Sequence, residues 1–333
     1  MNKTKFNRFL FILGLGVFAI FILSIFIGRY PSPPWMPINL LKTDLLARKL
    51  VLNLRLPRLL VAFLLGMVLS AAGTVLQMIF RNPLVEPGFL GVSQGAAFGA
   101  AASILWFNSH PLVIEISATF FGLLALAGSY FLSTRIRYGG WVLRLILSGI
   151  AVSALFSAGV GILKYIADPL TELPEITFWL LGGLYSVTWQ DLLYALPFAL
   201  VGIGVVIAMR WRINLLSLND DTAFSLGASL TRERLILLVT IVGAAAAMTA
   251  ISGVISWVGL IIPHIARRLF GASAEKSLPA AMLLGGGFTV LADDLARTLL
   301  AGEIPLGILT SAIGAGLFIY LMISMGIKVR RDG

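Results

Sequence analysis

Long runs of apolar residues, separated by short polar or charged stretches, make up most of the chain. The first run extends from Phe9 to Gly28 without a charge, and no small-residue cleavage site follows it. A helix needs about 20 apolar residues to cross a bilayer, so we expect this run to remain as a span and not to be removed as a signal peptide. The whole pattern predicts ten spans, at residues 9–28, 59–80, 88–107, 111–134, 143–166, 191–209, 235–256, 258–270, 278–300 and 305–325.

The eighth segment, residues 258–270, is too short to cross as a straight helix. We predict a half-span flanked by buried irregular backbone, which membrane proteins tolerate where protein or a cavity covers it. The expected fold is therefore all-α: one integral membrane domain over residues 1–333, with about ten transmembrane helices, one short half-span and an architecture resembling an inverted repeat.

Composition agrees with this interpretation and excludes several kinds of chemistry. Hydrophobic residues make up 59% of the chain and charged residues 12%, about half the charged share of soluble proteins. The absence of cysteine excludes disulfides and zinc–thiolate sites. The sequence also lacks a phosphate-binding Gly-x-x-x-x-Gly-Lys-Ser/Thr loop, a His-Glu-x-x-His motif and a dinucleotide-binding glycine motif. We therefore expect a protein that is not an enzyme and that obtains any energy it needs from a partner.

The net charge of +10 would suit nucleic-acid binding, but in a membrane protein the placement of Lys and Arg carries more information than their sum. Ten spans put both termini on one side of the membrane, and most of the 25 Lys and Arg residues fall on that side. The positive-inside rule then predicts that both termini are cytoplasmic. No nucleic-acid partner is expected.

One basic stretch falls on the opposite, external side. Five Lys or Arg residues lie between Lys42 and Arg58, and only Asp44 opposes them. These cations could extend to lipid headgroups or form a docking surface for an acidic external partner. The pattern favours docking and leaves contact with membrane lipid as the alternative.

Small residues recur every four positions in two spans and place a smooth face on each helix. In the third span such faces indicate close packing of helix backbones. In the fifth span, close packing and a weakly polar wall around a bulky substrate are equally compatible with the pattern. The residues are Gly91, Gly95, Gly99 and Ser103 in the third span and Gly149, Ser153, Ser157 and Gly161 in the fifth.

Seven short motifs follow one another along the chain. They are Arg55-Leu56-Pro57-Arg58, Gln77 with Arg81-Asn82-Pro83-Leu84-Val85-Glu86-Pro87-Gly88-Phe89-Leu90-Gly91-Val92-Ser93-Gln94-Gly95-Ala96, Phe178-Trp179-Leu180-Leu181-Gly182-Gly183-Leu184, Asn219-Asp220-Asp221-Thr222-Ala223-Phe224-Ser225-Leu226-Gly227, Gly259-Leu260-Ile261-Ile262-Pro263-His264-Ile265-Ala266-Arg267, Ala292-Asp293-Asp294-Leu295-Ala296-Arg297 and Glu303-Ile304-Pro305-Leu306-Gly307. In this order they resemble the FecCD family, the permease subunits of type II ABC importers. The resemblance covers about residues 40 to 325. One departure is Gly316, where the family usually has proline, and it leaves the bend of the last span open.

The resemblance implies a homodimer of ten-helix permease domains in the cytoplasmic (inner) membrane, with the substrate passage between the two copies and lined by the fifth and tenth spans. An ATP-binding cassette ATPase homodimer would bind on the cytoplasmic side, and a periplasmic or lipid-anchored substrate-binding protein would dock outside. The implied substrate is a ferric siderophore, haem or cobalamin, with molybdate or tungstate as the alternative; no cofactor is implied. An ion-coupled secondary transporter is less favoured, because such proteins bury ionisable residues in mid-span and the charges here lie near span ends.

The resemblance also assigns residues to roles. Docking of the binding protein falls to Arg55, Arg58 and Arg297, since guanidinium groups bind carboxylates in a bidentate manner; Arg297 could instead pair only with Asp293, one turn earlier. Coupling to the ATPase falls to residues 215–229, where Ser217 or Asn219 can cap a short helix, Asp220 and Asp221 suit its N-terminus, and Gly227 can end it. The coupling residues are Asn219, Asp220, Ala223, Phe224, Leu226 and Gly227, with Phe224 and Leu226 as apolar anchors.

A cytoplasmic gate is implied at two further segments, at Asn82 and Leu84 after the second span and at Val142 and Leu143 before the fifth. Prolines at 83 and 87 break the helix between the second and third spans, so a purely structural turn is the alternative. The two histidines are not expected to form a metal site. His264 is expected to be a hydrogen-bonded packing residue, and His110 lies in an external loop.

Overall fold

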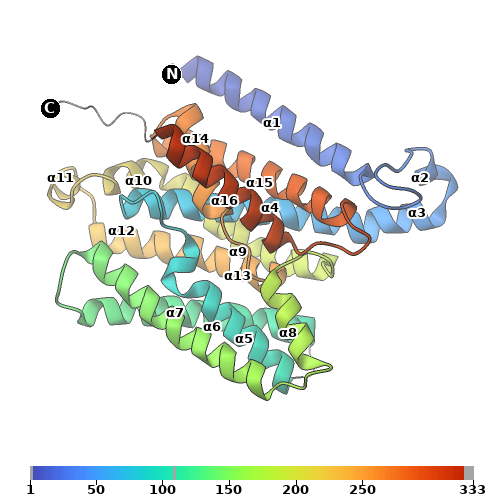
Figure 1. Cartoon of the computed structure of the whole chain (residues 1–333). Coiled ribbons are helices and arrows are strands. Elements are labelled where there is room, and N and C mark those ends of the chain that lie inside the picture. Colours follow the sequence, from blue (N-terminus) through green and yellow to red (C-terminus); the bar gives the residue numbers. More distant parts are fainter. Residues whose placement is uncertain (1–2, 108–109, 326–333) are drawn as a thin grey trace.

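The computed structural model describes residues 3–107 and 110–325, and helices joined by short connections make up these ranges (Figure 1). Each of the ten predicted spans coincides with helix, and seven described helical segments are long and apolar enough to cross a membrane. These are α1 (Lys3–Phe26), α4 (Leu56–Ile79), α6 (Pro111–Arg135), α7 (Trp141–Ile166), α9 (Trp189–Ala208), the consecutive α12 (Leu230–Leu237), η3 (Leu238–Val242) and α13 (Gly243–Ser252), and α15 (Ala274–Thr298). The all-α membrane fold is confirmed; the inverted repeat stays a prediction.

Shorter helices complete the bundle and mark its two ends. Within the bundle lie η2 (Pro87–Leu90), α5 (Val92–Trp106), α14 (Val258–Phe270) and α16 (Leu306–Met325). At one end, called here the α8 end, lie α2 (Leu40–Thr43), α3 (Leu45–Lys49), η1 (Leu50–Arg55) and α8 (Glu172–Leu181). At the opposite end, the α11 end, lie α10 (Arg210–Leu216) and α11 (Asp220–Ser225) (Figure 1). Apart from the predicted segment at 215–229, these end helices are too short to stand out in an apolar pattern.

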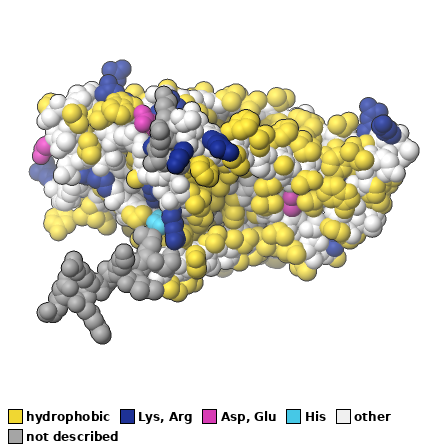
Figure 2. Space-filling view, turned by 90° about the horizontal axis from the view of Figure 1, so that it is seen from above, with side chains coloured by type: hydrophobic (Ala, Val, Ile, Leu, Met, Phe, Trp, Pro, Cys, Tyr) yellow, Lys and Arg dark blue, Asp and Glu magenta, His cyan; other side chains and the backbone are white. Residues whose placement is uncertain are grey.

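Helix α4 is the centre of the bundle. It packs most extensively against α15, and small residues make the approach possible: a Cβ added at Gly66 would lie 2.1 Å from the carbonyl oxygen of Gly285. The most apolar part of the segment containing α4 is 78% buried, whereas that of α1 is 11% buried. Helix α1 is therefore peripheral, and its exposed apolar side chains suit contact with lipid. Figure 2 shows mainly hydrophobic side chains over the middle of one face, with Lys and Arg toward its ends.

The predicted half-span is confirmed as α14, which contains 13 residues. Irregular backbone at residues 253–257 precedes it, and the N–H of Trp257 donates to the Glu86 carboxylate at 3.2 Å. The side-chain amide of Gln77 donates to the carbonyl oxygens of Gly259 and Leu260. The first bond satisfies irregular backbone, and Gln77 supplies a donor to the carbonyl oxygen of Gly259, which Pro263 cannot do four residues later.

The small-residue face of the third span packs closely, as predicted. Cβ atoms added at Gly95 and Gly99 of α5 would lie 2.4 Å from carbonyl oxygens of α6. In the fifth span, α7, the corresponding face divides. Gly149 is buried against the carbonyl oxygen of Phe89, so it packs within the subunit, whereas Ser157 and Gly161 are exposed.

Helix α16 continues through Gly316, where an added Cβ would meet no atom within 4 Å. Glycine at the family's proline position therefore coincides with an unbroken helix. The C-terminal cations counted for membrane orientation, Lys328, Arg330 and Arg331, lie outside the described residues.

Candidate functional site

A buried ion network joins α4 to α15 at the α8 end. Arg58, near the start of α4, donates to Asp293 of α15 at 2.9 and 3.1 Å and to Glu303 at 2.8 and 3.0 Å. One turn along α15, Arg297 pairs with Asp294 and donates to the carbonyl oxygen of Ser24 at 2.7 Å. Asp293 is fully buried. Such burial is tolerated because each carboxylate has a cationic partner.

The three arginines assigned to docking are all buried, with 6–9% of their surface exposed. Arg297 does not pair with Asp293 alone: its Nε lies 3.7 Å from Asp293, and its closer contact is with Asp294. Arg55 donates to the carbonyl oxygen of Ile25 at 3.0 Å, and no described carboxylate lies within ion-pair distance of it. A binding protein that docks on these arginines would have to reach them at the edge of the buried network, where Glu303 is the most exposed residue.

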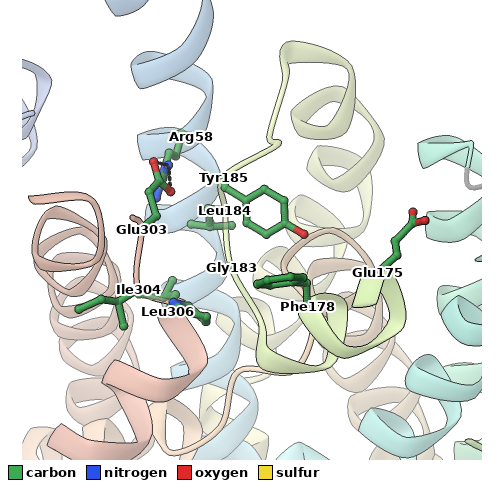
Figure 3. Close-up of a pocket in the computed structure, with 10 residues that line it drawn as sticks. Arg58, Glu175, Phe178, Gly183, Leu184, Tyr185, Glu303, Ile304 and Leu306 are labelled. Atoms are coloured by element: carbon green, nitrogen blue, oxygen red, sulfur yellow. Dashed lines mark hydrogen bonds and ion pairs between the residues drawn. The ribbon is translucent and has the colours of Figure 1, made fainter. Parts of the chain in front are cut away.

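A cavity of about 360 Å³ adjoins this network (Figure 3). Residues from three of the sequence motifs line it. Two backbone hydrogen bonds hold its walls: the N–H of Gly183 donates to the carbonyl oxygen of Ser252, and the N–H of Gly307 donates to that of Gly182. Phe178 and Tyr185 contribute aromatic rings, and the loop before α16 contributes an apolar wall. The lining residues are Arg58, Glu175, Phe178, Gly183, Leu184, Tyr185, Glu303, Ile304, Pro305 and Leu306.

A second cavity, of about 850 Å³, shares Glu175 and Tyr185 with the first and is also lined by His110, Glu115 and Asp191. Within residues 3–107 and 110–325, no group of three or more His, Asp and Glu side chains could hold a metal ion. His264 is half-buried on α14. The structure thus places the two histidines in separate environments.

At the α11 end, the predicted coupling segment forms a short helix with an exposed apolar side. Within α11, Ala223 is fully buried, whereas Phe224 is 73% exposed; Leu226, just after the helix, is 56% exposed. Gly227 ends the helix in the left-handed region, at φ +81°, which suits glycine. Asn219 occupies the N-cap position without capping the helix, because its side-chain oxygen accepts a hydrogen bond from Arg81 at 2.9 Å instead.

The first carboxylate of α11, Asp220, is bound by two arginines from other elements. Arg234 of α12 donates to it at 2.7 and 3.1 Å, and Arg81 lies 3.3 Å away. The hydrogen bonds from Arg234 are the main reason that the pKa of Asp220 lies below its ordinary value. The Arg234 guanidinium also lies 4.4 Å from the centre of the Trp141 ring, a favourable cation–π distance.

The four residues assigned to the gate lie beside these contacts. After α4, residues 81–86 are not helical, as the prolines predict, and the side-chain oxygen of Asn82 accepts from the N–H of Leu84 at 2.9 Å. Leu84 and Leu143 are exposed, whereas Val142 packs partly against the core. Sequence reasoning missed Trp141 and Arg234, because along the chain they are only an aromatic residue and a cation near span starts.

The whole chain was compared with protein families and with known proteins. Residues 16–324 match the model of the FecCD transport family. The chain belongs to this family. It is 39% identical over 342 residues to the molybdate import system permease protein of Haemophilus influenzae, covering 100% of this chain and 99% of the relative. It is 39% identical over 277 residues to the hemin transport system permease protein of Yersinia pestis, covering 82% of each.

A solved structure described as a metal-chelate type ABC transporter in an inward-facing conformation superposes with a TM-score of 0.88. Sequence identity is 38%, over 96% of this chain and 100% of that chain. This protein is therefore a membrane-spanning permease subunit of an ABC importer, a multi-pass protein of the inner membrane. Membership of the family implies an ATPase and a substrate-binding protein as partners.

Proposed function

We propose that this permease translocates a metal chelate, such as a ferric siderophore, haem or cobalamin. The cavity at the α8 end is the observation that carries the proposal. Its aromatic and aliphatic lining suits weak contact with a bulky ligand, and weak contact is what a passage needs for release. Among the described lining residues its only cation is Arg58, which Asp293 and Glu303 already neutralise. A small oxyanion would meet the Glu175 and Glu303 carboxylates without an unpaired cation.

A second candidate substrate is molybdate or tungstate, because the molybdate permease of Haemophilus influenzae matches this chain over its whole length. The two candidates separate in one assay: uptake into proteoliposomes containing the permease, its ATPase and the cognate binding protein. The panel comprises ferric siderophores, haem, cobalamin and molybdate. ATP-dependent uptake of a chelate with no uptake of molybdate supports the proposal; the reverse pattern replaces it with the second candidate.

We further propose that the α11 end faces the cytoplasm, with both termini on that side. Two copies of the permease would enclose the passage, with the exposed Ser157 and Gly161 of α7 facing it and Ser153 at its edge. The exposed Phe224 and Leu226 would insert into an ATPase homodimer that hydrolyses ATP on behalf of the permease. At the opposite end the exposed cations Lys42, Arg48 and Lys49 would contact lipid headgroups.

Orientation can be tested directly, because the chain has no cysteine of its own. Lys49→Cys and Arg137→Cys place single thiols on exposed positions at the two ends. In intact cells an impermeant thiol reagent should label position 49 and not position 137. Labelling of 137 alone would reverse the orientation and exchange the partners proposed for the two ends.

Docking of the binding protein is proposed at Arg55, Arg58 and Arg297. Glu303, whose side chain is 42% exposed, covers Arg58 in the permease alone. An acidic residue of the binding protein would take the place of Glu303 on Arg58 and would give Arg55 the carboxylate partner that it lacks in the described structure. Arg297 would hold the edge of the site through its pair with Asp294.

A further inference from the structure

Contacts at the α11 end close a ring that joins the coupling helix to both gate segments. Asp220 of α11 binds Arg234 of α12, and Arg234 lies over the ring of Trp141, the first residue of α7. Trp141 packs edge-to-face on Phe80 with 5.3 Å between ring centres. Arg81, next in the chain, returns to α11 through Asn219 and Asp220. We call Phe80, Arg81, Trp141, Asp220 and Arg234 the Asp220 ring.

Two members of the Asp220 ring are bonded directly to the gate segments. Arg81 is followed by Asn82 and Leu84, and Trp141 is followed by Val142 and Leu143. A displacement of either member therefore acts on a gate segment through one to three peptide bonds.

The backbone at Arg81 has an uncommon conformation. Its φ of +51° lies in the left-handed region, which non-glycine residues adopt only where the surroundings hold them there. Two backbone hydrogen bonds at the end of α4 hold it there, from the N–H of Arg81 to the carbonyl oxygen of Met78 and from the N–H of Asn82 to that of Gln77. The guanidinium of Arg81 also binds Asn219 and Asp220, so the first gate segment is attached both to the end of α4 and to α11.

Arg234 differs from the other charged members in its burial. Its side chain is 6% exposed, against 43% for Asp220 and 39% for Arg81. The planar guanidinium binds Asp220 at its edge and Trp141 on its face, which a lysine ammonium cannot do with the same geometry. Arg234 thus connects the surface helix with the start of α7.

We propose that the Asp220 ring transmits movement of α11 to the gate, with Arg234 as the positioning residue. The proposal rests on the proposed function, in which α11 binds the ATPase. When the ATPase shifts α11, Asp220 carries Arg234 and Arg81 with it, and these two residues move the start of α7 and the loop after α4 together. Both sides of the gate then respond to one displacement.

The test uses the permease assembled with its ATPase in proteoliposomes and carrying Leu143→Cys, and every variant is compared with the Leu143→Cys protein itself. Three quantities are measured: the affinity for the ATPase, the change in thiol reactivity at position 143 on addition of ATP, and uptake. Arg234→Lys and Arg81→Gln should reduce the ATP-dependent change by roughly 2- to 30-fold, the range expected for coupling residues. ATPase affinity should stay within about threefold, a difference below 1 kcal/mol.

A matched control is Arg135→Ala. Arg135 lies over an aromatic ring as Arg234 does, 5.0 Å from the centre of Phe131, and is exposed as Arg81 is, but no described hydrogen bond or ion pair joins it to the Asp220 ring. All three quantities should stay unchanged in this variant. If Arg234→Lys does not fold, Arg81→Gln still tests the proposal. Its folding should be less affected, because the Arg81 side chain is 39% exposed.

Two results would overturn the proposal. Loss of ATPase affinity in Arg234→Lys and Arg81→Gln would mean that the ring only builds the docking helix. An unchanged response at position 143 in both variants would mean that the gate is moved by another route. Failure of the proposed function looks different: Phe224→Asp would then bind the ATPase with normal affinity, whatever the ring variants do.

Discussion

The protein has an ion network at each end, and the two differ in burial and in what they join. At the α8 end, Arg58 and Asp293 connect α4 with α15, the most extensively packed helix pair, and Asp293 has no exposed surface. At the α11 end, Asp220 connects a short surface helix with a loop and with α12, and its side chain is 43% exposed. The first network lies along the closely packed pair α4 and α15, whereas the second joins a surface helix, a loop and α12.

The difference in burial decides which ion pairs stabilise the fold and which can break during transport. A buried charge that loses its partner is left in a poorly solvated environment, and the cost is large. The Arg81–Asp220 pair at the α11 end is partly solvated on both sides, so breaking it costs little, whereas Arg234 is buried and would lose its carboxylate at a larger cost. The exposed pair can therefore change during a transport cycle at the α11 end, and at the α8 end only the exposed edge, Glu303, is free to exchange partners at low cost.

The largest effect is expected from Asp293→Ala, which leaves Arg58 buried without its principal partner. The free energy of unfolding should fall by about 3–5 kcal/mol, measured by thermal or denaturant unfolding in detergent. Glu303→Gln removes the exposed partner of the same arginine and serves as the control, with an expected loss below about 1 kcal/mol. Equal, small losses in both variants would show that the network is hydrated and would remove the contrast between the two ends.

At the α11 end the corresponding large effect should be on binding. Phe224→Asp should weaken ATPase binding by about 2 kcal/mol or more, as expected for an apolar anchor, and should leave the unfolding transition unchanged because the side chain is exposed. Binding is measured with purified ATPase and the reconstituted permease. Tyr138→Asp changes an equally exposed ring in the connection between α6 and α7 and should bind normally. Equal losses in the two variants would indicate a non-specific charge effect.

Smaller effects of opposite sign are expected at the edge of the α8-end network. Arg55→Gln should weaken docking of the binding protein, and Glu303→Gln should strengthen it by removing the competing carboxylate. Each change should amount to about 0.2–1 kcal/mol and should diminish as salt rises. Affinities at low and high salt provide the measurement, with the exposed Arg8→Gln as control. A change of the same sign in both variants would contradict partner exchange at Arg58.

The smallest effect concerns the stability contributed by Asp220. Because Arg234 holds the pKa of this carboxyl below its ordinary value of 3.8, the stabilisation is fully present above that value and is lost as pH falls through the lower, folded value. Asp220→Asn keeps a side-chain oxygen that can accept from the buried Arg234, so its free energy of unfolding should stay within about 1 kcal/mol of the unchanged protein from pH 8 to pH 5. Below about pH 4 the difference should shrink, as the unchanged protein also loses the charge. A difference that varies between pH 8 and pH 5 would point to another titrating group.

The apolar pattern was sufficient for the helices that cross the membrane and for the short helix α14, because length and hydrophobicity are local properties of the chain. The same holds for the exposed Phe224 and Leu226, whose polar neighbours predicted a surface segment. The small end helices were not predicted. Helices α2, α3 and α8 contain four, five and ten residues, below the length at which an apolar pattern is distinctive.

The site was predicted in part. Motifs placed Arg58 and Arg297 at one end and Asp220 at the other, but they suggested free docking arginines where the structure has buried ion pairs. Arg58 and Asp293 are 235 positions apart in sequence. Their contact depends on the register between α4 and α15, which glycine approaches such as Gly66 against Gly285 determine.

The sequence by itself therefore determined a helical membrane protein of the FecCD family, its spans, its half-span and the exposed surface segment around Phe224. Only the tertiary structure decided which charges are paired, that Gly149 packs within the subunit, and that Arg234 connects Asp220 of α11 with Trp141 of α7. The physical reason is distance along the chain. Hydropathy and helix breaking act over a few residues, whereas an ion pair or a ring contact forms only after helices far apart in sequence have packed in one register.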